Sequence, residues 1–181
     1  MRPDVTKRRG LVGFTLIEIL VVVTIVGITA AIIVPQIGSR DDLKAASAAR
    51  VVMADLMFAQ NRAIATQAVR FVRFDPANNR YEVLDSLSPL VYAKNPVTKS
   101  NWIVTFGSAS SGGLSDSKLD SASFDSSQIV AFDSLGAPYS VTAANATVAL
   151  SSAGTIVVNS GSGTHPLTVS VEPDTGEISV Q

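Results

Sequence analysis

Gly13-Phe14-Thr15-Leu16-Ile17-Glu18 opens an apolar run that continues to Val34 and is followed by Pro35. The 21 residues from Phe14 to Val34 contain a single charged side chain, that of Glu18. An apolar helix of about 20 residues is long enough to cross the hydrocarbon core of a bilayer. A carboxylate inside such a segment is costly, so it indicates a functional contact with a partner. The sequence therefore predicts a transmembrane helix over residues 14–35, with Glu18 as its candidate functional residue.

Charges on either side of this run predict its orientation. Lys7, Arg8 and Arg9 precede the run, whereas the stretch from Arg40 to Lys44 after it is nearly balanced. Positive flanks stay on the cytoplasmic side, so we expect a cytoplasmic N-terminus and an exported domain from about residue 40. A secretory signal is the alternative. Its apolar core is usually shorter, about 7–15 residues, and cleavage would follow it, as at Thr29-Ala30-Ala31.

Composition excludes several classes of site. The chain of 181 residues has room for one modest domain beside the anchor, and it contains no cysteine, so disulfides and thiolate metal sites are excluded. Lys118 is the last lysine or arginine, which argues against nucleic-acid binding by the last third of the chain. We expect no cofactor. The acidic residues after Lys118 are Asp120, Asp125, Asp133, Glu172, Asp174 and Glu177.

A second helical pattern follows the apolar run. Pro35 and Gly38 predict a kink or a short unwound stretch, because proline removes a backbone donor. Apolar residues then recur at spacings of three and four, which predicts an amphipathic helix over residues 36–67. This stripe consists of Leu43, Ala46, Ala49, Val52, Met53, Leu56, Ala59 and Ala63.

Short strand patterns fill residues 68–181. Together with the long N-terminal helix they predict an α+β domain in which the helix packs on antiparallel sheet. Trp102 and Phe106, at strand spacing, are expected in its core. Pro173-Asp174-Thr175-Gly176 predicts a hairpin turn. The strand candidates are residues 68–74, 80–84, 102–106, 128–132, 147–150, 155–158, 167–172 and 177–180.

Two segments raise other possibilities. The segment from Gly107 to Ser127 is rich in serine, and this composition predicts a mobile surface loop. Its Asp116, Asp120 and Asp125 could bind calcium, although their spacing matches no calcium loop and solvated carboxylates explain them equally well. His165 is the only histidine and could belong to a Ser/His/Asp enzyme. No Gly-x-Ser-x-Gly motif accompanies it, and a solvated loop histidine explains it better.

The stretch from Gly13 to Val23 resembles the N-terminus of type IV pilins and type II secretion pseudopilins. The rest of the chain is similar to the GspH/FimT branch of minor pilins and pseudopilins. The likeness lies in Val72-Arg73-Phe74-Asp75 with Tyr81-Glu82-Val83, in the stretch from Phe132 to Pro138, and in Val169 to Glu172 with Thr175-Gly176.

The resemblance implies a processed filament subunit. A membrane prepilin peptidase would cut between Gly13 and Phe14 and methylate the new amine of Phe14. Glu18 would then face the N-terminal amine of a neighbouring subunit, since two opposite charges in lipid offset each other's desolvation. Pro35 lies where the long helix of this family commonly loosens. The implied partners are other pseudopilins or pilins in a hetero-oligomeric filament and an inner-membrane assembly platform.

Two branches of this family fit the sequence. The first is a GspH-like minor pseudopilin of a type II secretion system, anchored in the inner membrane with its domain in the periplasm. The second is a FimT-like or FimU-like minor type IV pilin that acts in pilus assembly, motility or DNA uptake. DNA-binding members carry arginines near the C-terminus after a glycine. Here Gly176 to Gln181 contains none, which argues against direct DNA capture.

Leader processing gives the first prediction. Intact-mass analysis of the protein purified from cells with active peptidase should show the loss of residues 1–13 and the addition of one methyl group. A protein that keeps its leader in those cells would contradict the assignment of Gly13 and Phe14.

Overall fold

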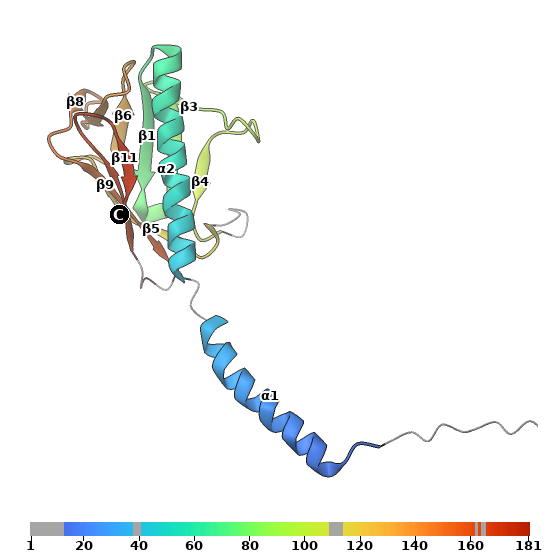
Figure 1. The fold of residues 1–181 in the computed structure, drawn as a ribbon. Helices are drawn as coiled ribbons and strands as arrows, with labels where there is room; N and C mark the ends of the chain where they lie inside the picture. The colour runs from blue at the N-terminus through green and yellow to red at the C-terminus, as the bar shows by residue number, and fades with distance from the viewer. Residues whose placement is uncertain (1–12, 38–40, 109–113, 162, 164–165) are drawn as a thin grey trace, which may run out of the picture. The chain divides into compact units, whose positions relative to one another are not determined.

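The computed structural model describes residues 13–37, 41–108, 114–161, 163 and 166–181; for residues 32–37 and 41 it describes the backbone alone. The chain divides into two units, residues 1–39 and 40–181. The first unit contains α1 (Leu16–Ile37), and the second contains α2 (Asp41–Thr66) and all the strands (Figure 1). The helical stretches expected over residues 14–35 and 36–67 correspond to α1 and α2. The residues between them, 38–40, lie outside the described part.

Two antiparallel sheets form the second unit. The larger has the order β3-β2-β1-β6-β7-β8, with β4 also pairing with β2, and the smaller has the order β11-β10-β9-β5. The strands are β1 (Arg70–Asp75), β2 (Arg80–Leu87), β3 (Leu90–Tyr92), β4 (Ile103–Thr105), β5 (Ser117–Ser123), β6 (Ile129–Phe132), β7 (Pro138–Val141), β8 (Thr147–Ala149), β9 (Gly154–Ser160), β10 (Leu167–Val171) and β11 (Ile178–Val180), with a 3-10 turn η1 (Pro76–Asn78).

α2 packs on both sheets, with contacts to β1 and β6 of the larger sheet and to β5, β9, β10 and β11 of the smaller one. Most of its buried side chains are alanine, which lets the helix backbone approach the strands closely. The predicted stripe is confirmed in its middle and C-terminal part and wrong at Leu43, which is 68% exposed because the buried face begins at Ala45. The fully buried residues of α2 are Ala45, Ala48, Ala49, Val52, Leu56, Ala59 and Ala63.

The α+β fold with a helix on antiparallel sheet is thus confirmed, and Trp102 and Phe106 lie in the core as expected. The prediction of a surface loop over 107–127 is wrong for its second half, which contains β5. A register shift between Leu119 and Ser121 breaks the alternation, so Leu119 and Ala122 both point inward although they are three residues apart. Residues 109–113 lie outside the described part.

Gly154 at the start of β9 is covered by an aromatic ring. A Cβ atom added there would lie 2.3 Å from Cδ1 of Phe124, whose buried ring stacks on Phe74 with centroids 5.8 Å apart. Packing of this kind leaves no room for a methyl group, because interiors are filled close to crystal density.

Gly154→Ala should therefore lower the free energy of unfolding by about 1–3 kcal/mol, the usual cost of overpacking a core. Thr147→Ala in the exposed strand β8 is the control, expected to change it by less than about 0.5 kcal/mol. Urea unfolding of the full chain in detergent measures both. Equal stabilities of the two variants would show that the ring moves aside without cost.

Candidate assembly site

The predicted cleavage site lies just before α1. Gly13, Phe14 and Thr15 are outside the helix, and Gly13 and Phe14 are exposed. A Cβ atom at Gly13 would meet nothing within 4 Å, so nothing in the described chain crowds this peptide bond. A peptidase that binds an extended backbone could therefore reach it. Cleavage and methylation at Gly13 and Phe14 stay predictions.

Thr15 caps the N-terminus of α1. Its Oγ1 accepts a hydrogen bond from the Glu18 backbone N–H at 3.3 Å, and its carbonyl accepts from the N–H groups of Glu18 and Ile19. Thr15-x-x-Glu18 is the sequence pattern of a capping box, a signal that the sequence analysis missed. A carboxylate in the first turn is also favoured by the positive end of the helix dipole.

Among the residues that the structure describes, none forms a hydrogen bond or an ion pair with the Glu18 carboxylate. The other polar side chains of residues 14–31 are threonines. Thr24 Oγ1 donates to the Leu20 and Val21 carbonyls, and Thr29 Oγ1 donates to those of Ile25 and Val26 at 2.9 and 3.0 Å. Every residue from Phe14 to Ala31 is exposed. An exposed apolar surface of this extent is suited to contact with lipid or with another apolar helix.

In the part of the chain that the structure describes, no helix has the length and apolarity required to cross a membrane. Pro35 falls inside α1, whose backbone is helical to Ile37, and its side chain lies outside the described set. The kink predicted at Pro35 stays a prediction.

The second unit contains a buried polar junction that no sequence pattern indicated. Asp55 Oδ2 on α2 accepts hydrogen bonds from the Tyr81 hydroxyl at 2.6 Å and from Trp102 Nε1 at 3.0 Å. The Trp102 ring also packs on Phe58, with centroids 4.5 Å apart. Burial raises the pKa of Asp55, and the two hydrogen bonds partly oppose this rise. Burial, with the nearby Asp55 carboxylate, raises the pKa of Tyr81 well above its usual value.

Two of the segments that carry the pilin likeness meet at one side chain of α2. Gln60 Nε2 donates to the Gly136 carbonyl, in the turn between β6 and β7, and to the Gly176 carbonyl, in the turn between β10 and β11, both at 2.9 Å. Both glycines have a positive φ, +87° and +65°. A Cβ atom at Gly176 would lie 2.6 Å from the Gly136 oxygen. Position 176 therefore accepts only glycine. Gln60 holds a turn of each sheet against α2.

The third segment of likeness is the β1–β2 pair. Phe74 lies opposite Tyr81, and Arg73 lies opposite Glu82. Arg73 pairs with the Glu82 carboxylate, which is only 2% exposed, and Arg80 Nη2 lies 3.6 Å from its other oxygen. A buried carboxylate is tolerated when it is paired in this way. This network stabilises the β1–β2 pair on the side of the sheet away from the core.

The three aspartates considered as calcium ligands each have a different partner. Asp116 pairs with Lys44, Asp120 with Lys118, and Asp125 accepts hydrogen bonds from Ser151 and Ser152. Within the described residues no three histidine or acidic side chains gather as metal ligands, and the calcium reading gains no support. His165 lies outside the described residues.

Comparison with known proteins gives one similarity in sequence and one in structure. No protein-family model matches the chain. A short N-terminal stretch is similar to the type II secretion system core protein G of Pseudomonas aeruginosa, with 64% identity over 36 residues, or 20% of this chain and 25% of that protein. The match thus spans about a quarter of that relative's length.

The fold is similar to a solved structure, the minor pseudopilin EpsH from the type 2 secretion system of Vibrio cholerae. The TM-score is 0.51 at 15% sequence identity, over 76% of this chain and 96% of that one. The chain therefore has the α+β fold of a minor pseudopilin.

The Asp55 junction predicts an unusual pH dependence. Because the folded pKa of Asp55 is raised, the folded state binds its proton more tightly than the unfolded state does, and the free energy of unfolding falls as pH rises from about 3.8 to the folded pKa. Asp55→Asn keeps an oxygen for Tyr81 and Trp102 but cannot titrate. The difference in unfolding free energy between wild type and Asp55→Asn should change with pH in this window and level off above it. A difference that is independent of pH would show that Asp55 titrates normally.

Proposed function

We propose that this chain is a minor pseudopilin of a type II secretion system, a structural subunit at or near the tip of a periplasmic filament that helps export folded proteins across the outer membrane. The observation that carries the proposal is Glu18, a carboxylate in an apolar helix that forms no hydrogen bond or ion pair with any other residue the structure describes, whereas Thr24 and Thr29 bond carbonyls of their own helix. This helix precedes a domain with the fold of a minor pseudopilin.

The proposed site of assembly is the start of α1. After cleavage between Gly13 and Phe14, the amine of a neighbouring subunit would supply the positive charge that Glu18 lacks. A carboxylate left alone in hydrocarbon costs several kcal/mol, so the pair favours insertion of each new subunit in one register. The apolar side chains of α1 would then contact lipid before assembly and other α1 helices after it.

The proposed setting follows from the sequence. The basic leader stays in the cytoplasm, residues 14–35 anchor the chain in the inner membrane, and residues 68–181 form the periplasmic domain. The proposed partners are the other pseudopilins of the filament, the prepilin peptidase and the inner-membrane assembly platform. The chain acts as a structural part rather than as an enzyme.

Complementation of a deletion strain tests this function. Deleting the gene should block release of the secreted enzymes into the medium, and wild type should restore it. Glu18→Gln keeps the size of the side chain and removes its charge, so it should be processed normally yet reduce release by about tenfold or more. Thr29→Ala, whose hydroxyl bonds only its own helix, is the matched control and should support normal release.

Two outcomes would contradict the proposal. Normal release in the deletion strain, with loss of pili or twitching, would place the chain in a type IV pilus instead. Normal release with Glu18→Gln would remove the charge-pairing argument and leave Glu18 as a helix cap.

A further inference from the structure

A pocket of about 610 Å³ lies at one end of the larger sheet, where β1 and β7 end and β6 begins. One wall is the segment that leads into β6, and the other is the turn between β7 and β8. Its volume falls within the range of roughly 300–1,000 Å³ found for ligand sites. We define the arginine pocket by six of its lining residues, which are Arg73, Gln128, Ile129, Val141, Thr142 and Asn145.

Arg73 is the one charged residue among the described residues that line this pocket. Its Nε and Nη2 bond the Glu82 carboxylate, which leaves Nη1 without a hydrogen bond to any other described residue. Arg80 pairs with both Glu82 and Asp75, so the four charges of this network cancel in sum. They are not equally accessible, however, because Glu82 is 2% exposed whereas the Arg73 side chain is 34% exposed. The pocket is therefore lined by a guanidinium group and not by the carboxylate that holds it.

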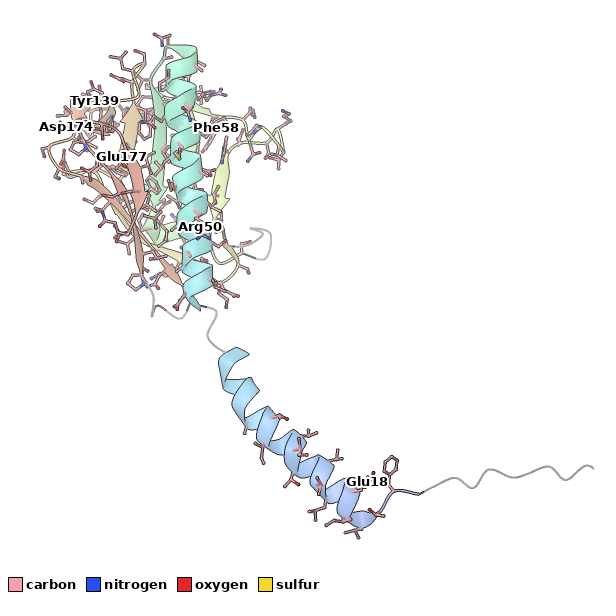
Figure 2. All side chains as sticks on the ribbon, in the orientation of Figure 1. Glu18, Arg50, Phe58, Tyr139, Asp174 and Glu177 are labelled. Atoms are coloured by element: carbon pink, nitrogen blue, oxygen red, sulfur yellow. The ribbon has the colours of Figure 1, made fainter. Side chains whose placement is uncertain are left out.

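Both walls of the arginine pocket are uncharged. Residues 126–132 and 134–171 contain no lysine, arginine, aspartate or glutamate. The acidic residue next to one wall, Asp125, accepts hydrogen bonds from two serines in the turn before β9. Asp174 and Glu177, which Figure 2 labels, belong to the connection between β10 and β11 in the smaller sheet. An anionic group that enters the pocket therefore meets a positive charge and no carboxylate of the lining.

Two side-chain amides and two apolar side chains complete the pocket. Neither Gln128 nor Asn145 forms a side-chain hydrogen bond with another described residue, and each amide carries two N–H donors. Ile129 and Val141 add apolar surface beside them. Ligand sites commonly combine apolar lining with a few polar groups that fix orientation. The arginine pocket thus offers donors for an anion and apolar contacts for the group that carries it.

Backbone hydrogen bonds hold both walls in place. The Gln128 carbonyl accepts from the Phe74 N–H at 2.9 Å, which ties one wall to β1. In the other wall, the Thr142 N–H donates to the Ala146 carbonyl and the Asn145 N–H donates to the Thr142 carbonyl, both at 2.9 Å. A preformed site loses little conformational entropy when a ligand binds, so these walls favour binding.

We propose that the arginine pocket binds a glutamate or aspartate side chain carried by an extended segment of another protein. The carboxylate bonds Arg73 Nη1 and the amides of Gln128 and Asn145, and such charge-assisted hydrogen bonds are stronger than neutral ones. Side chains two residues away in an extended segment lie on the same face as the acidic residue, so apolar ones there contact Ile129 and Val141. A nucleic acid would need further cations, and the described lining holds none beyond Arg73. Binding at this pocket does not depend on the proposed filament function.

A peptide titration followed by NMR tests the site, with the full chain isotopically labelled and held in an uncharged detergent. The probe is the peptide Ac-Val-Ala-Glu-Ala-Val-NH2, and the matched peptide has glutamine in place of glutamate. The glutamate peptide should shift the backbone signals of Gln128, Ile129, Thr142 and Asn145. It should bind about fivefold more tightly than the glutamine peptide, because the carboxylate bonds a cation. Free glutarate should bind more weakly than the glutamate peptide, because it lacks the two valines.

Substitutions then locate the contact. Gln128→Glu adds a carboxylate to the pocket and should weaken binding of the glutamate peptide about fivefold or more. Asn61→Asp adds the same charge to an exposed position of α2 outside the pocket and should bind like the wild type. Arg73→Gln combined with Glu82→Gln removes the cation without leaving a buried carboxylate unpaired. This double variant should bind the two peptides with equal affinity.

Three results would overturn the inference: equal affinities of wild type for the two peptides, shifted signals that lie outside the pocket, or equal losses with Gln128→Glu and Asn61→Asp. Binding of glutarate as tight as that of the glutamate peptide would indicate a site for small carboxylic acids and refute the peptide segment. The spectrum of each variant without peptide reports whether it is folded. If the double variant does not fold, the comparison of Gln128→Glu with Asn61→Asp decides.

Discussion

The second unit of the chain depends on α2 lying across two sheets at once, and the side-chain amide of Gln60 bonds a turn of each sheet. Its two N–H bonds reach the Gly136 and Gly176 carbonyls, 76 and 116 residues along the chain. A side chain at position 176 would collide with the Gly136 carbonyl oxygen and with Gln60 Nε2, so the two turns could not lie this close together. A partly buried amide that lost these acceptors would keep part of its desolvation cost without compensation. The spacing between the sheets therefore follows from this contact and from the alanines of α2.

The loop between β3 and β4 and the turn between β10 and β11 are positioned by the same arrangement. Asp55 fixes Tyr81 and Trp102 to α2 on the side of β2, and thereby holds the base of the loop that presents Val97. Gln60 fixes the turn that presents Glu172 and Asp174 on the other side. Both segments are therefore held by one helix, α2.

Much of this could be read from the sequence because the patterns are local. The apolar run indicated α1, the spacing of Ala49, Val52 and Leu56 indicated α2, and Thr175-Gly176 indicated the last hairpin. β5 was missed because a bulge puts Leu119 and Ala122 out of alternation. The contacts of Asp55 and Gln60 were missed for another reason. Their partners lie at least 26 residues away, and the periodicity of one segment carries no information about which distant group it will meet.

The most direct test of this account compares two carboxamide-to-carboxylate substitutions on adjacent residues of α2. Gln60→Glu replaces the donor that binds both turns by an acceptor facing two carbonyls, whereas Asn61→Asp makes the same change on an exposed residue. Urea unfolding of the full chain in detergent at neutral pH should show a loss of about 1–3 kcal/mol for Gln60→Glu. The loss for Asn61→Asp should be less than about 0.5 kcal/mol. Equal stabilities would contradict the claim that Gln60 holds the two sheets on α2.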